Sequence, residues 1–228
     1  MSLTVNLEAV RAEYLHRMTC GDGQLLQQVE HYVADRKGKM LRPQLTLLAA
    51  ATLGEDTLHS RRTLLLATCV EMLHNASLLH DDVIDQADER RGQPSVNAQW
   101  SNSVAVLVGD YHLAQTMHLL DEVNDAEASR MVNRTVMAMV ESELLAQQVD
   151  NTPRSADEYL RIIDGKTARL FATACALGNP EYEEFGLHYG RLFQLRDDIA
   201  DGEGNEWTQE LMLKEQETIS HLPQLNVQ

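Results

Sequence analysis

The sequence is poor in the residues that stabilise small extracellular domains. Its 228 residues include three cysteines, Cys20, Cys69 and Cys175, which are far apart. Their spacing contains no Cys-x-x-Cys pair or Cys/His pattern typical of a zinc site. A sparse, odd count of cysteines is typical of a reducing compartment, and no basic start followed by an apolar segment indicates a signal peptide. We therefore expect a cytoplasmic protein.

Long apolar runs and basic residues are also scarce. The longest uncharged apolar runs, such as Val104–Gly109, are far shorter than the ~20 residues that span a membrane. The chain has 19 basic and 35 acidic side chains, a formal net charge of −16. Such a chain is a poor general binder of nucleic acid, which must neutralise phosphates. The composition therefore predicts no transmembrane segment and no nucleic-acid partner, but it is compatible with a small phosphate ligand screened by metal ions.

Proline and glycine number only 5 and 12, and they cluster at breaks between helical patterns. Residues 56–91 contain neither, and their apolar residues cover nearly every face of a helix. This pattern predicts a central helix roughly 40 Å long. Ser155 with Glu158 predicts a capping box, and Gly178-Asn179-Pro180 predicts a helix end followed by a new start. We expect eight or nine helices in a single all-α domain over residues 1–228.

One short motif occurs twice, as Asp81-Asp82-Val83-Ile84-Asp85 and as Asp197-Asp198-Ile199-Ala200-Asp201. Residues i and i+4 of a helix lie ~40° apart, so each motif places several carboxylates on one side of a helix end. The charges repel one another, and the helix dipole disfavours them at a C-terminus. A single such motif is most simply a solvated acidic face. Two motifs, each directly after apolar helical residues, instead predict oxygen ligands for Mg²⁺ ions that bridge substrate phosphates.

Basic residues accompany these motifs. Residues 36–43 contain four of them, Arg90-Arg91-Gly92 follows the first motif, and Lys166-Thr167 lies between the two motifs. Each group alone is typical of a solvated surface. In a chain with only 19 basic residues, their arrangement around two acidic motifs indicates a shared site for an anion.

With these residues in view, the sequence resembles the trans-isoprenyl diphosphate synthases, also called polyprenyl synthetases. The resemblance runs from about Gln28 to Asp201, and the order and spacing of its short stretches make it specific. Those stretches are residues 38–43, 71–85, 90–94, 108–111, 141–143, 165–167 and 193–198.

The resemblance implies an isoprenoid-synthase-type helical bundle around a central cavity, with both Asp motifs at its mouth. It implies head-to-tail condensation of an allylic diphosphate with isopentenyl diphosphate. It also assigns roles to the residues that match. The Mg²⁺ ligands would be Asp81, Asp82, Asp85, Asp197 and Asp201, with Asp198 behind them; the allylic diphosphate would be held by Arg90, Lys166 and Gln194, with Thr167 at the reacting centre; and isopentenyl diphosphate would be held by Lys39, Arg42, His74 and Arg91.

The resemblance also bears on product length and assembly. Bulky aromatic residues four or five positions before the first motif end chain growth early in this family, whereas Ser77 and Ala76 are small. We expect a product longer than fifteen carbons. The helices are apolar on more than one face, and the family usually pairs two subunits, so we expect a homodimer.

Family members usually continue for several helices after the second motif and carry another lysine there. Here 27 residues follow Asp201, and their one lysine, Lys214, does not match. The sequence alone favours either a short variant with a more open site or missing residues, and a second subunit could supply the absent wall.

Three alternatives stay open at this point. The chain could be an accessory subunit of a heteromeric synthase, although such a subunit has no need of six clustered carboxylates. It could be a class I terpene cyclase, although an Asn/Ser/Glu motif would then be expected in second place. Glu71 and His74 form a Glu-x-x-His, as in di-iron bundles, but no second such motif is present.

Overall fold

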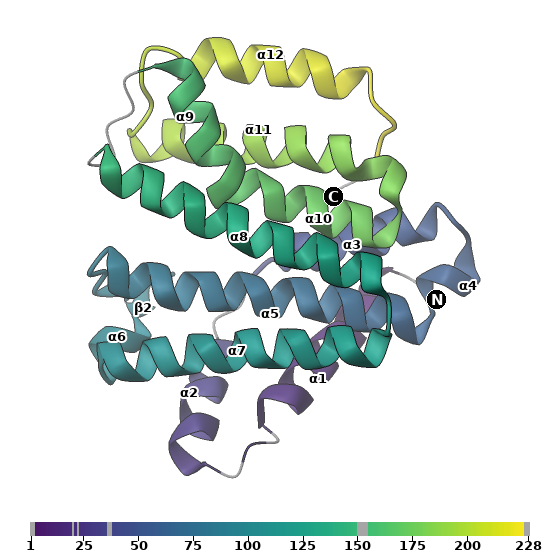
Figure 1. Cartoon of the computed structure of the whole chain (residues 1–228), viewed down its shortest axis with the longest axis vertical. Helices are drawn as coiled ribbons and strands as arrows, with labels where there is room; N and C mark the ends of the chain where they lie inside the picture. Colours follow the sequence, from purple (N-terminus) through teal and green to yellow (C-terminus); the bar gives the residue numbers. More distant parts are fainter. Residues whose placement is uncertain (1–2, 20, 22, 36–37, 150–154, 226–228) are drawn as a thin grey trace. The chain divides into compact units, whose positions relative to one another are not determined.

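The computed structural model describes residues 3–19, 21, 23–35, 38–149 and 155–225. Cys20, Arg36, Lys37 and Pro153 lie outside the described residues. The chain divides into two compact units, Met1–Gln44 with His59–Asp125 and Leu45–Leu58 with Ala126–Gln228, and each is described by itself. Within the described residues there are twelve α-helices and two strands of two residues each (Figure 1). The all-α prediction is therefore confirmed.

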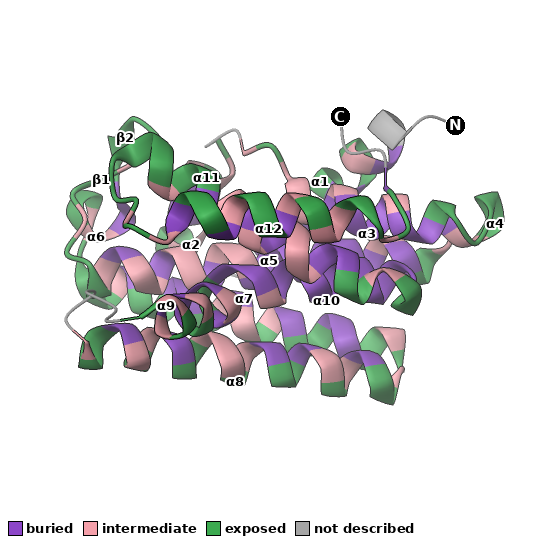
Figure 2. Ribbon diagram, turned by 90° about the horizontal axis from the view of Figure 1, so that it is seen from above, coloured by how far each residue is buried: buried purple, intermediate pink, exposed green. Residues whose placement is uncertain are grey.

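The first unit is built around α5 (Arg61–Ile84), which lies along α7 (Asn102–Val123) and contacts α1 (Leu3–Thr19) (Figure 1). Ser60 caps its start by accepting a hydrogen bond from the backbone N–H of Thr63. At 24 residues α5 is about 36 Å long. Much of its surface is buried, as the apolar sequence predicts (Figure 2).

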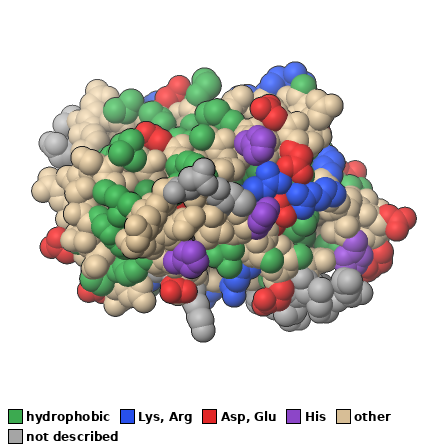
Figure 3. Space-filling view, turned by 90° about the horizontal axis from the view of Figure 1, so that it is seen from below, with side chains coloured by type: hydrophobic (Ala, Val, Ile, Leu, Met, Phe, Trp, Pro, Cys, Tyr) green, Lys and Arg blue, Asp and Glu red, His purple; other side chains and the backbone are tan. Residues whose placement is uncertain are grey.

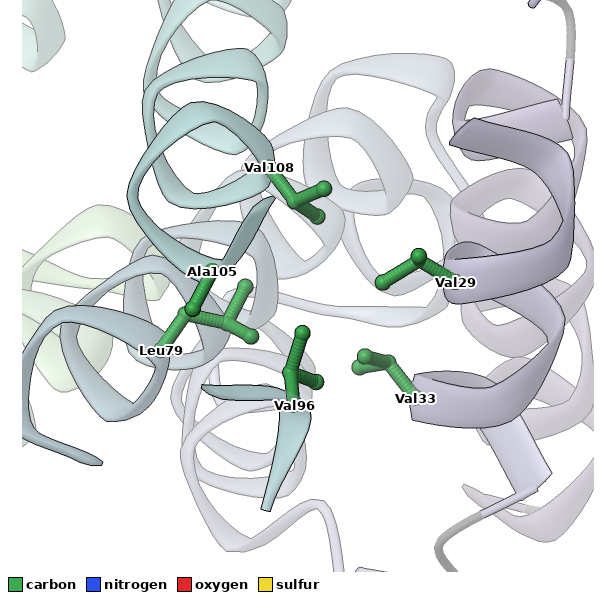
Figure 4. Packing of buried hydrophobic residues seen from close by; sticks show 6 residues of the cluster. All are labelled: Val29, Val33, Leu79, Val96, Ala105 and Val108. Carbon is green, nitrogen blue, oxygen red and sulfur yellow. The ribbon is translucent and has the colours of Figure 1, made fainter. Parts of the chain in front are cut away.

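A second packing site in this unit holds α2 (Gln24–Asp35) in place. Val29 and Val33 of α2 point toward Leu79 of α5, Val96 of α6 (Val96–Gln99), and Ala105 and Val108 of α7 (Figure 4). All six side chains are buried. These contacts attach the apolar side of α2 to α5, α6 and α7.

Between α5 and α6 the chain makes a tight hairpin of β1 (Glu89–Arg90) and β2 (Gln93–Pro94). The two residues of its turn, Arg91 and Gly92, both have positive φ, 55° and 76°. Two consecutive left-handed residues make the turn whose twist matches antiparallel strands. The sequence predicts a break here, but it does not predict the strand pairing.

The second unit contains most of α3 (Leu41–Ala51) together with the C-terminal helices. These are α4 (Glu55–Leu58), α8 (Ala126–Gln148), α9 (Ala156–Ile163), the π-helix η1 (Asp164–Ala168), α10 (Arg169–Gly178), the 3₁₀-helix η2 (Pro180–Tyr182), α11 (Glu183–Asp201) and α12 (Thr208–Ser220). α11 packs against both α10 and α12. Nine of the ten residues of α10 are buried, so it forms the centre of this unit.

Two predicted helix boundaries are confirmed in the second unit. The Ser155 hydroxyl accepts a hydrogen bond from the backbone N–H of Glu158 at 3.2 Å. α10 ends at Gly178, and the Asn179 side chain caps the helical turn that begins at Pro180. A Cβ on Gly178 would lie 2.2 Å from the Thr46 carbonyl oxygen, so glycine also allows α3 to approach this helix end.

On the face drawn in Figure 3, basic, acidic and histidine side chains are interspersed rather than separated by sign. None of the described helices is both long enough and apolar enough to cross a membrane.

Candidate active site

The first Asp motif forms the last turn of α5, and its three carboxylates have different surroundings. Asp81 is half-buried and Asp85, at the C-cap, is exposed. Asp82 is only 1% exposed. Its Oδ1 accepts a hydrogen bond from Nε of Arg90 at 2.7 Å, and a second guanidinium nitrogen of Arg90 contacts the same oxygen. Asp82 is therefore paired with Arg90 in the structure.

Helix geometry explains why the three carboxylates have different surroundings. Consecutive helical residues are rotated by about 100°, so Asp82 turns inward while Asp81 and Asp85 stay on one side. The hairpin then brings Arg90 of β1 back to the inward carboxylate. The sequence predicts that Asp82 binds metal and that Arg90 binds diphosphate. In the structure the two side chains are paired with each other, and both roles stay predictions.

The second Asp motif, which ends α11, repeats the division. Asp197 and Asp201 are exposed. Asp198 accepts a hydrogen bond from Nε2 of Gln194 at 2.7 Å, and the Tyr159 hydroxyl donates to its other oxygen. Burial, and then the Asp198 carboxylate, raise the pKa of Tyr159, so this hydroxyl keeps its proton and acts as the donor.

This hydrogen-bonded chain continues to Thr167 of η1. The buried Thr167 hydroxyl donates to Oε1 of Gln194 at 2.6 Å, which fixes the orientation of the amide. Because an amide nitrogen carries two hydrogens, Gln194 keeps one N–H for a ligand. The predicted site residues Thr167, Gln194 and Asp198 are thus brought together by one network.

Lys166 lies in the same π-helical turn. Its Nζ is 3.1 Å from Oε2 of Glu143 on α8, and the side chain is 38% exposed. Gly165 is needed for this approach, because a Cβ there would lie 2.3 Å from Cβ of Ser142. Single π-helical turns occur often at functional sites, since the extra residue redirects the side chains that follow.

The residues predicted to hold isopentenyl diphosphate lie in the first unit. Arg42, in the first turn of α3, has NH1 3.1 Å from Nε2 of His74 on α5. Desolvation, and then the charges of Arg42, Arg91 and Arg90, hold the pKa of His74 well below its usual range. The imidazole is therefore neutral near pH 7 and accepts from Arg42. Lys39, in the segment that precedes α3, is exposed.

The di-iron alternative does not fit this arrangement. Burial raises the pKa of the Glu71 carboxyl, and the charges acting against that shift come from Arg42, Arg91 and Arg11. Cations around Glu71 disfavour a metal ion there. Among the described residues, no three His, Cys, Asp or Glu side chains gather closely enough to hold a metal by themselves.

The sequence did not point to Tyr159 or to a role for Glu143. Tyr159 is 39 residues from Asp198, and no local spacing links the two. Glu143 belongs to a stretch that carries the family resemblance, but only the fold shows that it pairs with Lys166.

Comparison with known proteins decides what these motifs belong to. Residues 23–212 match the family model described as Polyprenyl synthetase. The chain belongs to the polyprenyl synthetase family. The family resemblance predicted from the sequence is therefore confirmed, and the all-helical isoprenoid-synthase fold with it.

Individual polyprenyl synthetases are similar over most of the chain. An all-trans-nonaprenyl-diphosphate synthase (geranyl-diphosphate specific) of Rhodobacter capsulatus is 40% identical over 188 residues, covering 78% of this chain and 57% of that protein. A heptaprenyl diphosphate synthase component 2 of Geobacillus stearothermophilus is 35% identical, covering 90% and 66%. The crystal structure of a polyprenyl synthase from Caulobacter crescentus CB15, complexed with calcium and isoprenyl diphosphate, gives a TM-score of 0.82 at 32% identity, covering 89% and 64%. The chain thus spans about three-fifths to two-thirds of these relatives.

Proposed function

We propose that this polyprenyl synthetase extends a trans-polyprenyl diphosphate by condensing an allylic diphosphate with isopentenyl diphosphate. The product is longer than fifteen carbons, and the reaction depends on Mg²⁺. The names of the relatives, which include nona-, octa- and decaprenyl diphosphate synthases, support a long product. The calcium in the related crystal structure supports a divalent cation.

The observation that carries this proposal is that the three carboxylates of each Asp motif have different surroundings, in the same pattern in both motifs. In each, the second Asp accepts hydrogen bonds from side chains of the protein, and the carboxylates at positions i and i+4 lie at the end of a helix. Neither helix has a basic residue in its last turn, so the dipole and the carboxylates both favour a cation there. Hard oxygen ligands at two sites fit Mg²⁺, which commonly keeps waters and binds substrate phosphates. The donor set thus fits the metal, through Asp81, Asp85, Asp197 and Asp201.

The other residues act on the two substrates. Arg90, Lys166 and the remaining N–H of Gln194 bind the allylic diphosphate, and Lys39, Arg42, His74 and Arg91 bind isopentenyl diphosphate. When bound, Mg²⁺ supplies positive charge that stabilises the departing diphosphate. The allylic C–O bond breaks, the isopentenyl double bond forms the new C–C bond, and the proton lost passes to the released diphosphate. Apolar side chains keep water away from the cation formed at carbon.

The direct test is incubation with labelled isopentenyl diphosphate, allylic primers of ten, fifteen and twenty carbons, and Mg²⁺. We expect labelled products longer than fifteen carbons, resolved by chromatography after removal of the diphosphate. If the chain, incubated without any other protein, leaves the primers unchanged, the proposal is contradicted. Cyclic hydrocarbon products would instead favour a terpene cyclase.

Tyr159→Phe removes the hydrogen bond to Asp198 without changing the shape of the side chain. We expect the Mg²⁺ concentration for half-maximal activity to rise about tenfold, because a lost hydrogen bond to a charged group is worth about 1.5–3 kcal/mol. Tyr182→Phe, whose ring packs on Phe185, is the matched control. An unchanged Mg²⁺ dependence in Tyr159→Phe would show that this network does not support the second motif.

We also propose that the chain pairs with a second copy of itself. α7 exposes Leu107 and Met117 (66% and 61%), and α8 exposes Met137, Val140 and Leu144 (59%, 55% and 64%). The three on α8 follow a helical spacing of i, i+3 and i+7 and form one apolar stripe. An interface on α8 would cover this stripe.

Sedimentation at micromolar concentration is expected to show a dimer, and Leu107→Asp with Leu144→Asp is expected to shift it toward monomer. Glu127→Ala, on the exposed polar side of α8, is the control. A monomeric wild-type chain would contradict homodimerisation. The relative named component 2 supports a second candidate, in which a different chain takes the place of the second copy.

A further inference from the structure

Three side chains on one side of α11 connect this helix to α9 and η1. Asp198 and Gln194 are hydrogen-bonded to Tyr159 and Thr167, as described above. Arg191 precedes them, and the three follow a spacing of i, i+3 and i+7, which places them on the same side of the helix. The proposed function gives Arg191 no role.

Arg191 binds Asp164, the first residue of the π-helical turn η1. Its Nε lies 2.5 Å from Oδ1 of Asp164 and its Nη2 lies 2.7 Å from Oδ2, so each carboxylate oxygen accepts one hydrogen bond. Paired, charge-assisted hydrogen bonds of this kind fix the orientation of the two groups as well as their distance. The Asp164 side chain therefore has a defined position against α11.

The main chain of Asp164 forms the bond that makes this turn π-helical. Its carbonyl oxygen accepts a hydrogen bond from the N–H of Arg169, five residues later, where a regular α-helix uses the N–H four residues later. Lys166 and Thr167 lie between the two ends of this bond. The residue at which the wide turn begins is thus the one whose carboxylate is bound by Arg191.

Glu215 of α12 binds the other side of Arg191. α12 runs along α11 (Figure 1). Oε1 of Glu215 lies 3.3 Å from Nη1 of Arg191, and its other carboxylate oxygen pairs with Nδ1 of His188. The Glu215 side chain is 4% exposed, and a buried carboxylate is costly unless it is paired. A series of contacts therefore leads from α12 through Arg191 to the turn that carries Lys166.

We propose that Arg191 is a positioning residue, which maintains the π-helical turn by binding Asp164 and is itself kept in place by Glu215. A π-helical turn is a rare departure from the α-helix, and the paired bonds from Arg191 stabilise it at the residue where it begins. The turn then presents Lys166 and Thr167 to the allylic diphosphate. That last consequence rests on the proposed function, whereas the effect of Arg191 on the turn does not.

Hydrogen–deuterium exchange of the full chain tests the turn without any substrate. In Arg191→Met, the backbone amides of residues 164–169 should exchange about tenfold faster than in wild type, the scale of a lost hydrogen bond between charged groups. The amides of residues 171–177, in the buried helix α10, should change less. Equal acceleration in both segments would show that Arg191 only stabilises the whole unit, and an unchanged rate in residues 164–169 would show that it does not maintain the turn. Either result overturns the proposal.

Two further variants test the partners of Arg191. Asp164→Asn keeps the shape of the side chain, should also accelerate exchange in the turn, and decides the question if Arg191→Met does not fold. Because each change breaks the same pair, the double variant should be little faster than Arg191→Met, and fully additive effects would overturn the pairing. Glu215→Gln should accelerate exchange in the turn by a smaller factor, and an unchanged rate would overturn the role of α12.

Arg61→Met is the matched control, because Arg61 also bridges two carboxylates. Its Nη1 and Nη2 lie 2.8 and 3.0 Å from the two carboxylate oxygens of Glu13 on α1, and Nη2 lies 3.0 Å from Oε1 of Glu122 on α7. Arg61→Met should leave exchange in residues 164–169 at the wild-type rate. Faster exchange there would show that the turn responds to any loss of a bridging arginine, and it would overturn a specific role for Arg191.

Steady-state kinetics add a measurement that depends on the proposed function. Arg191→Lys keeps the charge but not the planar group that binds both oxygens of Asp164. We expect it to raise KM for the allylic diphosphate about tenfold and to leave KM for isopentenyl diphosphate unchanged. An equal rise in both KM values, or a fall in kcat alone, would overturn the positioning role. Absence of turnover in wild type contradicts the proposed function, and the exchange rates then decide this inference by themselves.

Discussion

Asp81→Ala and Asp197→Ala are each expected to lower turnover by about a thousandfold, the effect of losing one group that stabilises developing charge. The structure supports these two positions over their neighbours. Each is the first residue of an i, i+4 pair at a helix end, where removal of a carboxylate relieves repulsion. The helical circular dichroism and the melting temperature should therefore stay at or above their wild-type values. Steady-state kinetics at saturating Mg²⁺ provide the measurement.

Two further variants make this result specific. Asp121→Ala removes an exposed carboxylate near the end of α7 and should leave turnover unchanged. Asp82→Ala should behave differently from Asp81→Ala, because it strands Arg90 and lowers the free energy of unfolding by about 2 kcal/mol. Wild-type turnover in Asp81→Ala or Asp197→Ala would contradict the assigned chemistry.

Ser77→Phe is expected to shorten the product sharply while the first condensation is kept. Ser77 lies four residues before Asp81, about 40° around the helix, so a bulky ring there stands one turn below the proposed reaction centre. The side chain is half-buried, and its hydroxyl bonds to the His74 carbonyl oxygen at 2.9 Å. Product chain length after incubation with isopentenyl diphosphate is the measurement, and Ser77→Ala is the size-matched control.

Ala76→Phe tests the neighbouring position. Ala76 is 1% exposed and lies about 140° from Asp81 around α5, so a phenyl ring there also overpacks buried surface. We expect shorter products together with a loss of about 1–3 kcal/mol in the free energy of unfolding. A wild-type product of fifteen carbons or fewer, or unchanged lengths in both variants, would place the floor of the cavity on another helix.

The fold class, the family and several helix ends could be predicted from the sequence, because their causes are local. The Ser155 cap and the Gly178-Asn179-Pro180 boundary depend only on residues within a few positions. The doubled Asp motif likewise places carboxylates on helix ends through spacing alone. These features do not depend on how distant segments pack.

The roles within the site could not be predicted in the same way. Spacing shows that Asp82 and Asp198 point away from their neighbouring carboxylates, but not that Asp82 is buried and pairs with Arg90. Tyr159 is hydrogen-bonded to Asp198, which lies 39 residues later in the sequence. Lys166 contacts Glu143 from a π-helical turn, which is a local irregularity of the backbone. Such pairings are set by tertiary packing, which overrides what neighbouring residues suggest.

The π-helical turn at Asp164–Ala168 has one more consequence. It can be seen as a single residue inserted into an otherwise continuous helix formed by α9 and α10. Deleting one residue from this turn would return the helix to regular phase. Every side chain after the deletion would then rotate by about 100° relative to α9. The hydroxyl of Thr167 would leave Gln194, and the ammonium group of Lys166 would leave Glu143. A one-residue change in length thus separates a regular helix from one whose polar side chains reach Gln194 and Glu143.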